Sequence, residues 1–235
     1  MIPQFPLCVI PAGGDATRMG DLCKDTPKCL LEVNGKPILQ HILDYWRQYC
    51  RQFVVVTKPQ WAPLILQRFE ADETLVDIGC EVIDAETSSV PESILAGLRH
   101  TWVPDQFAVV LGDVLLDGAF DWSLLDRERH GIGVMEGDPD FARSYAVGIT
   151  PAPTRIFPGD PHVAQVAGVI EKPATGVGVY LFNWTAIATL EAVGNRSITD
   201  VVQTLVAEDC WLPVVPLPFT GRMLNVTFES DMARW

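Results

Sequence analysis

Two glycines, an arginine and a lysine near the start of the chain are of the types that together hold phosphate groups. Gly13 and Gly14 follow an apolar run at residues 5–11, and Arg18 and Lys28 come shortly after them. Adjacent glycines allow a positive φ and let a ligand approach the main chain closely, and successive N–H groups in such a loop form an anion-binding concavity. Because two cations stand beside this loop in an acidic chain, the pattern predicts a site for a specific anionic ligand.

Composition limits the other classes of partner. The net charge of −13 argues against nucleic acid and against an anionic membrane surface, both of which attract clustered Lys and Arg. Hydrophobic residues make up 48% of the 235 residues, so a folded core is expected rather than disorder. The six cysteines form no C-x-x-C or zinc spacing, and we interpret them as reduced thiols of a cytoplasmic protein. No signal peptide and no apolar run long enough to span a bilayer is apparent.

The elements that must position these residues alternate between strand and helix. Short apolar runs bounded by turn residues are separated by stretches with helical periodicity, which predicts an α/β fold: a three-layer α/β/α sandwich with a mixed, mostly parallel central sheet. Strands are expected at 5–11, 53–57, 80–84, 107–111, 178–182 and, as a pair around a loop, within 131–150. Helices are expected at 38–49, 61–69, 89–102, 122–129 and 198–207.

A carboxylate follows the most apolar of the predicted strands. Residues 107–111 read F-A-V-V-L, as in a strand buried on both faces, and Gly112 and Asp113 come directly after it. Ligands of open α/β sheets bind at the carboxyl ends of the strands, where Asp113 would be placed to hold magnesium on a nucleotide phosphate. The simpler alternative is an aspartate that only shapes the turn at the end of a strand.

Two capping boxes mark helix starts that could also line a site. Ser89 is followed at the third position by Glu92, and Ser197 is followed in the same way by Asp200. A cap and a ligand contact are compatible readings of both segments.

Several motifs, taken in chain order, resemble one enzyme family. The opening pattern P-A-G-G-x-x-T-R-M, followed by P-K-x-L-L-x-V-x-G-K-P, resembles the signature of the sugar-1-phosphate nucleotidyltransferases, in the MobA-like and GT-A-like superfamily. L-G-D at 111–113, E-K-P at 171–173, G-V-Y at 178–180, I-T-D at 198–200 and N-V-T at 225–227 resemble later elements of that family. The resemblance implies the Rossmann-like fold of the nucleotide-diphospho-sugar transferases. It also implies a single domain, with a nucleotide-binding part at about 1–120 and a sugar-phosphate-binding part at about 121–235.

The same resemblance implies a role for each matching residue. Where most sugar nucleotidyltransferases have a second metal-binding aspartate, this chain has Asn225, a neutral ligand that is also found in the related molybdopterin guanylyltransferases. The catalytic residues implied are Arg18, Lys28, Asp113 and Lys172; the nucleotide-binding residues are Ala12, Gly13, Gly14, Ser89 and Gly112; the sugar-phosphate-binding residues are Gly148, Glu171, Lys172 and Thr199; and the Mg²⁺ ligands are Asp113 and Asn225.

The implied reaction is attack by a sugar-1-phosphate oxygen on the α-phosphorus of an NTP, with release of pyrophosphate. Such chemistry depends on positioning and charge neutralisation more than on a protein base. Three alternatives remain open: a cytidylyltransferase for a non-sugar phosphate such as phosphocholine or a polyol phosphate, a GT-A glycosyltransferase, which would need an Asp-x-Asp-type motif, and a catalytically silent nucleotide-binding regulator. The nucleobase and the sugar are not specified by the sequence, and a homodimer is possible for the class.

Overall fold

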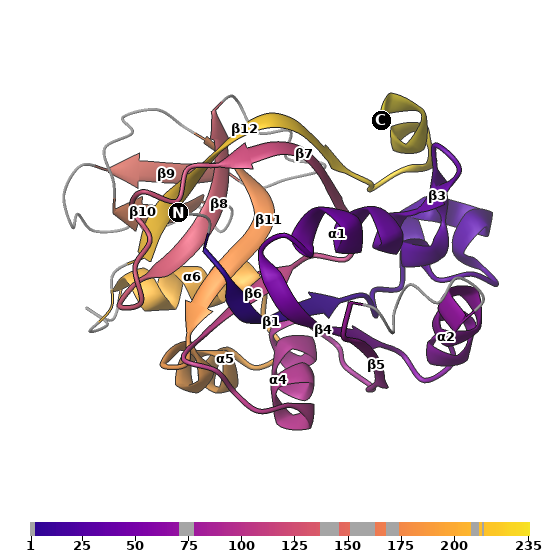
Figure 1. The fold of residues 1–235 in the computed structure, drawn as a ribbon, viewed down its shortest axis with the longest axis horizontal. Coiled ribbons are helices and arrows are strands. Elements are labelled where there is room, and N and C mark those ends of the chain that lie inside the picture. The colour runs from indigo at the N-terminus through magenta and orange to yellow at the C-terminus, as the bar shows by residue number, and fades with distance from the viewer. Residues whose placement is uncertain are drawn as a thin grey trace.

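A single large sheet with helices on both faces forms the body of the protein. The computed structural model of the chain describes residues 3–70, 78–136, 146–150, 163–167, 174–207, 212 and 214–235. The principal strand order is β5-β4-β1-β6-β11-β8-β12-β7, and β9 and β10 join it through β11. The predicted α/β sandwich with a mixed, mostly parallel sheet is therefore confirmed (Figure 1).

The first half of the sheet is entirely parallel. β1 lies between β4 and β6, and β5 pairs with the outer side of β4. These strands are rich in Val, Ile and Phe side chains, most of them buried, as expected when helices cover both faces. Their carboxyl ends meet at one edge of the sheet. The bounds are Phe5–Pro11 for β1, Cys50–Thr57 for β4, Cys80–Asp84 for β5 and Gln106–Val110 for β6.

The second half of the sheet reverses direction at β11. This strand is antiparallel to both β6 and β8, whereas β12 is parallel to β8 and antiparallel to β7. Because Asn225 pairs with Val114, the last residue of β12 lies at the carboxyl edge of β6. The bounds are Val114–Phe120 for β7, His130–Glu136 for β8, Ala146–Thr150 for β9, Val163–Ala167 for β10, Ala174–Asn183 for β11 and Val214–Asn225 for β12.

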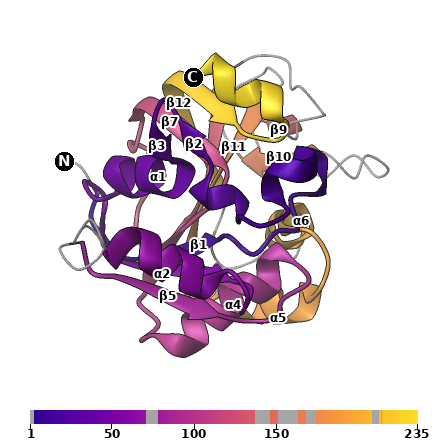
Figure 2. The same cartoon turned by 90° about the vertical axis from the view of Figure 1, so that its right-hand side faces the viewer.

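The helices divide between the two faces of the sheet, as Figures 1 and 2 show. Alternation along β1 supplies both cores, because Cys8 and Ile10 join the core beneath α1 and α2, whereas Leu7 and Val9 join the core beneath α4, α5 and α6. The bounds are Ile38–Trp46 for α1, Ala62–Glu70 for α2, Val90–His100 for α4, Ala186–Val193 for α5 and Ile198–Ala207 for α6.

Short elements complete the edge that carries the site. The 3₁₀ segments η1 (Thr17–Cys23) and η2 (Lys28–Leu30) follow β1, and a small hairpin of β2 (Glu32–Val33) and β3 (Lys36–Pro37) comes next. Asn34 and Gly35 have φ values of 53° and 74°, the left-handed pair that a two-residue hairpin turn requires. The 3₁₀ helix η3 (Glu229–Arg234) lies against β2 (Figure 2).

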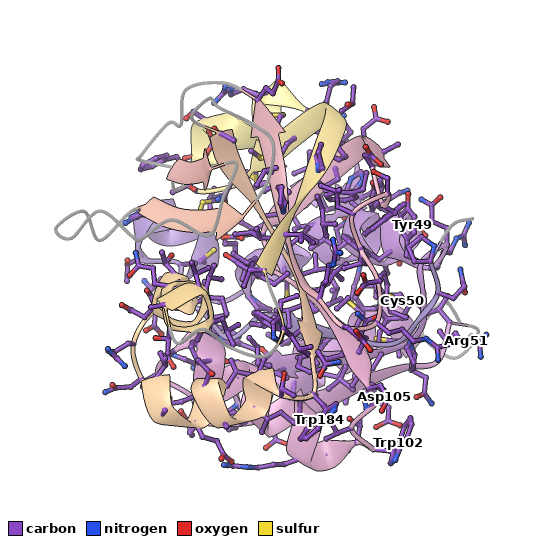
Figure 3. All side chains as sticks on the ribbon, turned by 90° about the vertical axis from the view of Figure 1, so that its left-hand side faces the viewer. Tyr49, Cys50, Arg51, Trp102, Asp105 and Trp184 are labelled. Carbon is purple, nitrogen blue, oxygen red and sulfur yellow. The ribbon has the colours of Figure 1, made fainter. Side chains whose placement is uncertain are left out.

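Three details of the predicted helices are wrong. The helix expected over 38–49 ends at Trp46, three residues earlier. The segment 122–129 contains turns instead of a helix, because Asp121 Oδ1 accepts a hydrogen bond from the Ser123 N–H and Asp126 Oδ1 accepts one from the Glu128 N–H. Such local bonds offer the backbone an alternative to the helix. The helix expected to reach Trp102 ends at His100, two residues earlier, and the Trp102 side chain is 78% exposed (Figure 3).

Candidate active site

A cleft of about 860 Å³ lies at the carboxyl edge of the parallel strands. It is formed by the loop after β1, the end of β6, the start of α4, the turn before α6 and the end of β12. These segments are far apart in the sequence, and the sheet topology brings them together. In the described part of the chain the lining consists of residues 11–18, 28, 29, 58, 87–90, 93, 111–113, 195–197, 225 and 227.

The glycine loop provides an open main-chain surface at the floor of the cleft. A Cβ built on Gly14 would meet nothing within 4 Å, so a ligand can approach the backbone there. Neither Gly13 nor Gly14 has the positive φ that the sequence suggested; the left-handed residues of this segment are Ala16 (φ 48°) and Gly20 (φ 57°). The two glycines therefore contribute through their lack of a side chain, which leaves the main chain accessible, and not through an unusual backbone conformation.

Gly112 allows the end of β6 to approach the loop after β1. The Gly112 N–H donates to the Pro11 carbonyl oxygen at 3.1 Å, and a Cβ built on Gly112 would lie 2.7 Å from that same oxygen. Real Cβ atoms do not come so close to a carbonyl, so any side chain here would push the two segments apart. Ala12 and Asp113 consequently line the same cleft.

Arg18 and Lys28 are each held by buried neighbours. Arg18 is exposed beside Met19, which is 3% exposed and anchors η1 in the core. Lys28 stands between the buried residues Pro27 and Cys29 at the start of η2. Both cations line the cleft, as the sequence predicted, and the glycine loop runs along the same cleft.

Asp113 sits at a tight turn whose geometry is fixed from both sides. The Val114 N–H donates to the Leu111 carbonyl at 3.3 Å, and the Val226 N–H donates to the Asp113 carbonyl at 2.9 Å. The Asp113 carboxylate accepts a hydrogen bond from Lys28 Nζ at 2.6 Å. Asn225, directly before Val226, also lines the cleft, and its Oδ1 accepts a bond from the Thr227 hydroxyl at 3.3 Å.

The turn that carries Asp113 therefore adjoins the end of β12 that carries Asn225, and both predicted metal ligands line the cleft. Among the described residues no group of three or more His, Cys, Asp or Glu side chains could hold a metal by itself. One carboxylate and one amide oxygen are a donor set that suits Mg²⁺, which commonly takes one or two carboxylates and completes its shell with phosphate oxygens and water.

Ser89 and the turn before α6 also line the cleft. The Ser89 hydroxyl caps α4 by accepting from the Glu92 N–H, and it donates to the Gly194 carbonyl at 3.1 Å. It thereby joins the start of α4 to the turn that carries Arg196. The carboxylate of Glu92 accepts hydrogen bonds from the N–H and the hydroxyl of Ser88, the residue before the cap. Ser197 and Asp200 form a complete capping box at the start of α6.

The structure puts none of the predicted sugar-phosphate residues in the described lining of the cleft. Thr199 lies in the first turn of α6 and is not part of the cleft lining, although Ser197 is. Gly148 lies in β9, in register with Gln165 of β10. Glu171 and Lys172 fall outside the residues that the structure describes, so their roles remain predictions from the resemblance.

Two basic residues of the cleft, Lys58 and Arg196, were missed from the sequence. Lys58 follows the last residue of β4, and Arg196 lies in the turn between α5 and α6. Neither belongs to a motif. Lys58 could have been found from topology alone, because residues that follow neighbouring parallel strands meet at the same edge of the sheet.

The charges of the lining favour a polyanion and give no sign of nucleophilic catalysis. Its described charged side chains are the four cations Arg18, Lys28, Lys58 and Arg196 and the two carboxylates Asp15 and Asp113. Cys29 also lines the cleft, but burial raises its pKa to about 12 and keeps the thiol protonated near neutral pH. The site can therefore bind, orient and neutralise phosphates.

Sequence comparison identifies relatives along most of the chain. The chain is 27% identical over 239 aligned positions to the UTP–glucose-1-phosphate uridylyltransferase AglF of Haloferax volcanii, an alignment that covers 95% of this chain and 92% of that protein. It is 20% identical to the bifunctional protein GlmU of Methanocaldococcus jannaschii over 86% of this chain, which spans about half (47%) of that protein.

Solved structures show the same fold. A glucose-1-phosphate thymidylyltransferase from Bacillus anthracis superposes with a TM-score of 0.74 at 16% identity, covering 97% of this chain and 93% of its own. The inositol-1-phosphate CTP transferase of T. maritima superposes with a TM-score of 0.72 at 14% identity, covering 98% and 93%. A family model for the MobA-like NTP transferase domain matches residues 8–154, which include the glycine loop, Lys28 and Asp113. The resemblance seen in the opening motif is thus confirmed, and the chain belongs to the MobA-like NTP transferase family.

Proposed function

We propose that the protein transfers a nucleoside monophosphate from an NTP to a sugar-1-phosphate, giving an NDP-sugar and pyrophosphate. The observation that carries this proposal is the convergence, in one cleft, of the glycine loop, Arg18, Lys28, Asp113 and Asn225. A silent nucleotide-binding module would need the loop alone, whereas the full set equips the cleft for transfer.

The task of each residue is inferred from the family resemblance and, for the residues that line the cleft, from their position there. The main-chain N–H groups of residues 12–14 bind the triphosphate, and Arg18 binds the departing pyrophosphate. Lys28 aligns the donor phosphates, and Lys172 does so for the acceptor phosphate. Ser89 and Gly112 help to hold the nucleotide, while Gly148, Glu171 and Thr199 belong to the acceptor side. The division into a nucleotide-binding part at about 1–120 and an acceptor part at about 121–235 belongs to the same proposal.

Asp113 and Asn225 are the proposed magnesium ligands. Asn225 is in register with Val114, the residue after Asp113, and this placement, with the oxygen chemistry of both groups, fits an ion that is shared with phosphate oxygens. When bound, Mg²⁺ supplies charge neutralisation at the reacting phosphates. Lys28, now held by Asp113, is then available to the phosphates. No proton transfer from the protein is needed, because a phosphate nucleophile is already ionised at neutral pH.

The cellular setting follows from the proposed substrates. NTPs and sugar phosphates are small cytoplasmic metabolites, and a cytoplasmic enzyme is consistent with free thiols at Cys8, Cys23, Cys29, Cys50 and Cys80. None of the helices in the described part of the chain has both the length and the apolar character needed to cross a membrane.

A pyrophosphate-release assay tests the function. The purified protein is incubated with Mg²⁺, one of UTP, dTTP, CTP, ATP or GTP, and one of a panel of sugar-1-phosphates. We expect release that requires one matched NTP and one sugar phosphate. Turnover restricted to CTP with phosphocholine or a polyol phosphate would replace the proposal by the cytidylyltransferase alternative. Nucleotide binding with no release in any combination would support the silent regulator instead.

A further inference from the structure

Lys58 is bound in this structure to a carboxylate that stands at the entrance of the proposed phosphate loop. Its Nζ donates a hydrogen bond to Asp15 Oδ1, and both residues line the cleft. Asp15 directly follows Gly14, so the ion pair lies next to the loop to which the proposed function assigns the triphosphate.

The backbone of Lys58 is held beside the loop. The Ala12 N–H donates to the Val56 carbonyl at 2.7 Å, and the Thr57 hydroxyl donates to the Ala12 carbonyl at 3.4 Å, so the loop is joined to the end of β4. A Cβ built on Gly13 would lie 3.5 Å from the Lys58 backbone nitrogen. The Lys58 side chain is only 17% exposed and has little freedom to turn its charge to bulk water.

The two partners differ in how easily each can leave the pair. The Asp15 side chain is 70% exposed, so its carboxylate can move into water at small cost. Lys58 is confined to the cleft and would need another anion there. A bound triphosphate supplies that anion, and the Lys28–Asp113 pair shows the same arrangement of a confined lysine facing a cleft carboxylate.

We propose that Lys58 is a triphosphate-binding residue and that Asp15 is its competitor, which occupies Lys58 until the nucleotide arrives. The inference rests on the proposed function, since it takes the glycine loop as the donor phosphate site. The proposal predicts that removing Lys58 weakens the binding of the triphosphate, whereas removing the charge of Asp15 strengthens it.

The test measures the affinity for inorganic tripolyphosphate by titration calorimetry without divalent metal, which removes any dependence on the base. Lys58→Met should weaken binding about tenfold or more, as for the loss of a charge-assisted hydrogen bond. Asp15→Asn should tighten it by about two- to fivefold, because an exposed ion pair of this kind no longer has to be broken. The double variant should bind about tenfold more weakly than Asp15→Asn alone.

Two results would overturn the inference. If both single variants weaken binding, the pair merely holds the loop in shape. If the double variant binds like Asp15→Asn, Lys58 acts only by screening Asp15. In either case tripolyphosphate still binds to the wild-type protein and the proposed function stands. Absence of tripolyphosphate and NTP binding by the wild-type protein would instead refute the donor site itself.

The Lys36–Asp44 ion pair is the matched control. It joins the same residue types at 2.8 Å and lies outside the cleft lining. Lys36→Met and Asp44→Asn change the net charge by the same amounts as the two test variants. We expect neither to change the affinity by more than about twofold, in keeping with surface charges of this kind. Equal shifts in control and test variants would mean that overall charge, not Lys58, sets the affinity.

Discussion

The Lys28 ammonium lies 2.6 Å from the Asp113 carboxylate, and this contact joins η2 to the end of β6 across the cleft. Lys28 is 17% exposed and Asp113 30%, so both groups face the cleft more than bulk water. In the absence of ligands each neutralises the other. Under the proposed function, a metal–nucleotide complex would replace the pair without net loss of charge compensation, because the metal would bind the carboxylate and the phosphates would bind the lysine.

Asp113→Asn should reduce turnover strongly while the fold remains intact. The amide keeps the size of the side chain but removes the charge, and we expect kcat to fall by about two to three orders of magnitude, as when one electrostatic stabilising group is lost. Pyrophosphate release measures the effect, and circular dichroism checks the fold. Asp117→Asn, at an exposed position of β7, is the control and should be near normal. Near-normal turnover of Asp113→Asn would remove Asp113 from the mechanism.

Asn225→Asp should reduce the Mg²⁺ concentration needed for half-maximal activity. The proposed ligand set now contains one carboxylate, that of Asp113, and the variant would add a second. The affinity of a site for hard cations such as Mg²⁺ rises with the number of carboxylate ligands. Asn225→Ala should shift the requirement in the opposite direction. The measurement is a magnesium titration of initial rates at saturating substrates. An unchanged midpoint in both variants would show that Asn225 does not contact the metal.

Gly112→Ala should destabilise the protein as well as the site. The added Cβ would lie 2.7 Å from the Pro11 carbonyl oxygen, and overpacking of this kind costs about 1–3 kcal/mol of unfolding free energy. Gly14→Ala is the control for stability, because its Cβ would meet open space. Urea unfolding of both variants gives the comparison. If Gly112→Ala is as stable as wild type, the two segments separate more freely than the close contact implies.

His130 should make the protein less stable in acid. Its Nδ1 accepts a hydrogen bond from the Asn183 N–H, and burial lowers its pKa from 6.5 to about 4. Between these two values the unfolded chain binds a proton that the folded protein does not, so stability falls as pH falls through this window. The contribution has a slope of at most about 1.4 kcal/mol per pH unit for one proton.

His130→Asn provides the measurement for this effect. The amide oxygen can still accept from the Asn183 N–H, but it does not titrate. Urea unfolding at several values between pH 4 and 7 should show a shallower loss of stability in the variant than in the wild type. Parallel curves for the two proteins would mean that carboxylates alone account for the acid sensitivity.

Short sequence patterns correctly predicted the strands and helices that are determined by residues close together in the chain. β1, α4 and α6 were predictable because an apolar run, or a serine cap with an apolar face, specifies each of them. Residues 122–129 were not, because the turn bonds of Asp121 and Asp126 override a helical pattern. β7, β10, β12 and α5 were also missed. Trp102 looked like a core residue but stands beyond the end of α4 and just before Pro104, which disfavours a continuing helix.

The candidate site was predictable to the extent that motifs carry it. Arg18, Lys28, Asp113 and Asn225 were identified by resemblance, and the structure brings all four to one cleft. Lys58 belongs to no motif and reaches the cleft only because β4 pairs with β1 in parallel. Whether such a residue reaches the cleft depends on the order of the strands in the sheet, and the spacing of residues along the chain does not specify that order.

The hydrogen bond from Val226 to Asp113 also has a consequence for folding. Asp113 follows β6, whereas Asn225 and Val226 reach it only after β12 has paired with β7 and β8. These contacts span more than a hundred residues, and such non-local pairing forms slowly. Under the proposed function, a metal–nucleotide complex should therefore be recognised only by fully folded molecules, and it would stabilise them by an amount that rises with the logarithm of its free concentration above the dissociation constant. Ligand-induced protection from proteolysis would then report directly on the maturation of newly made chains.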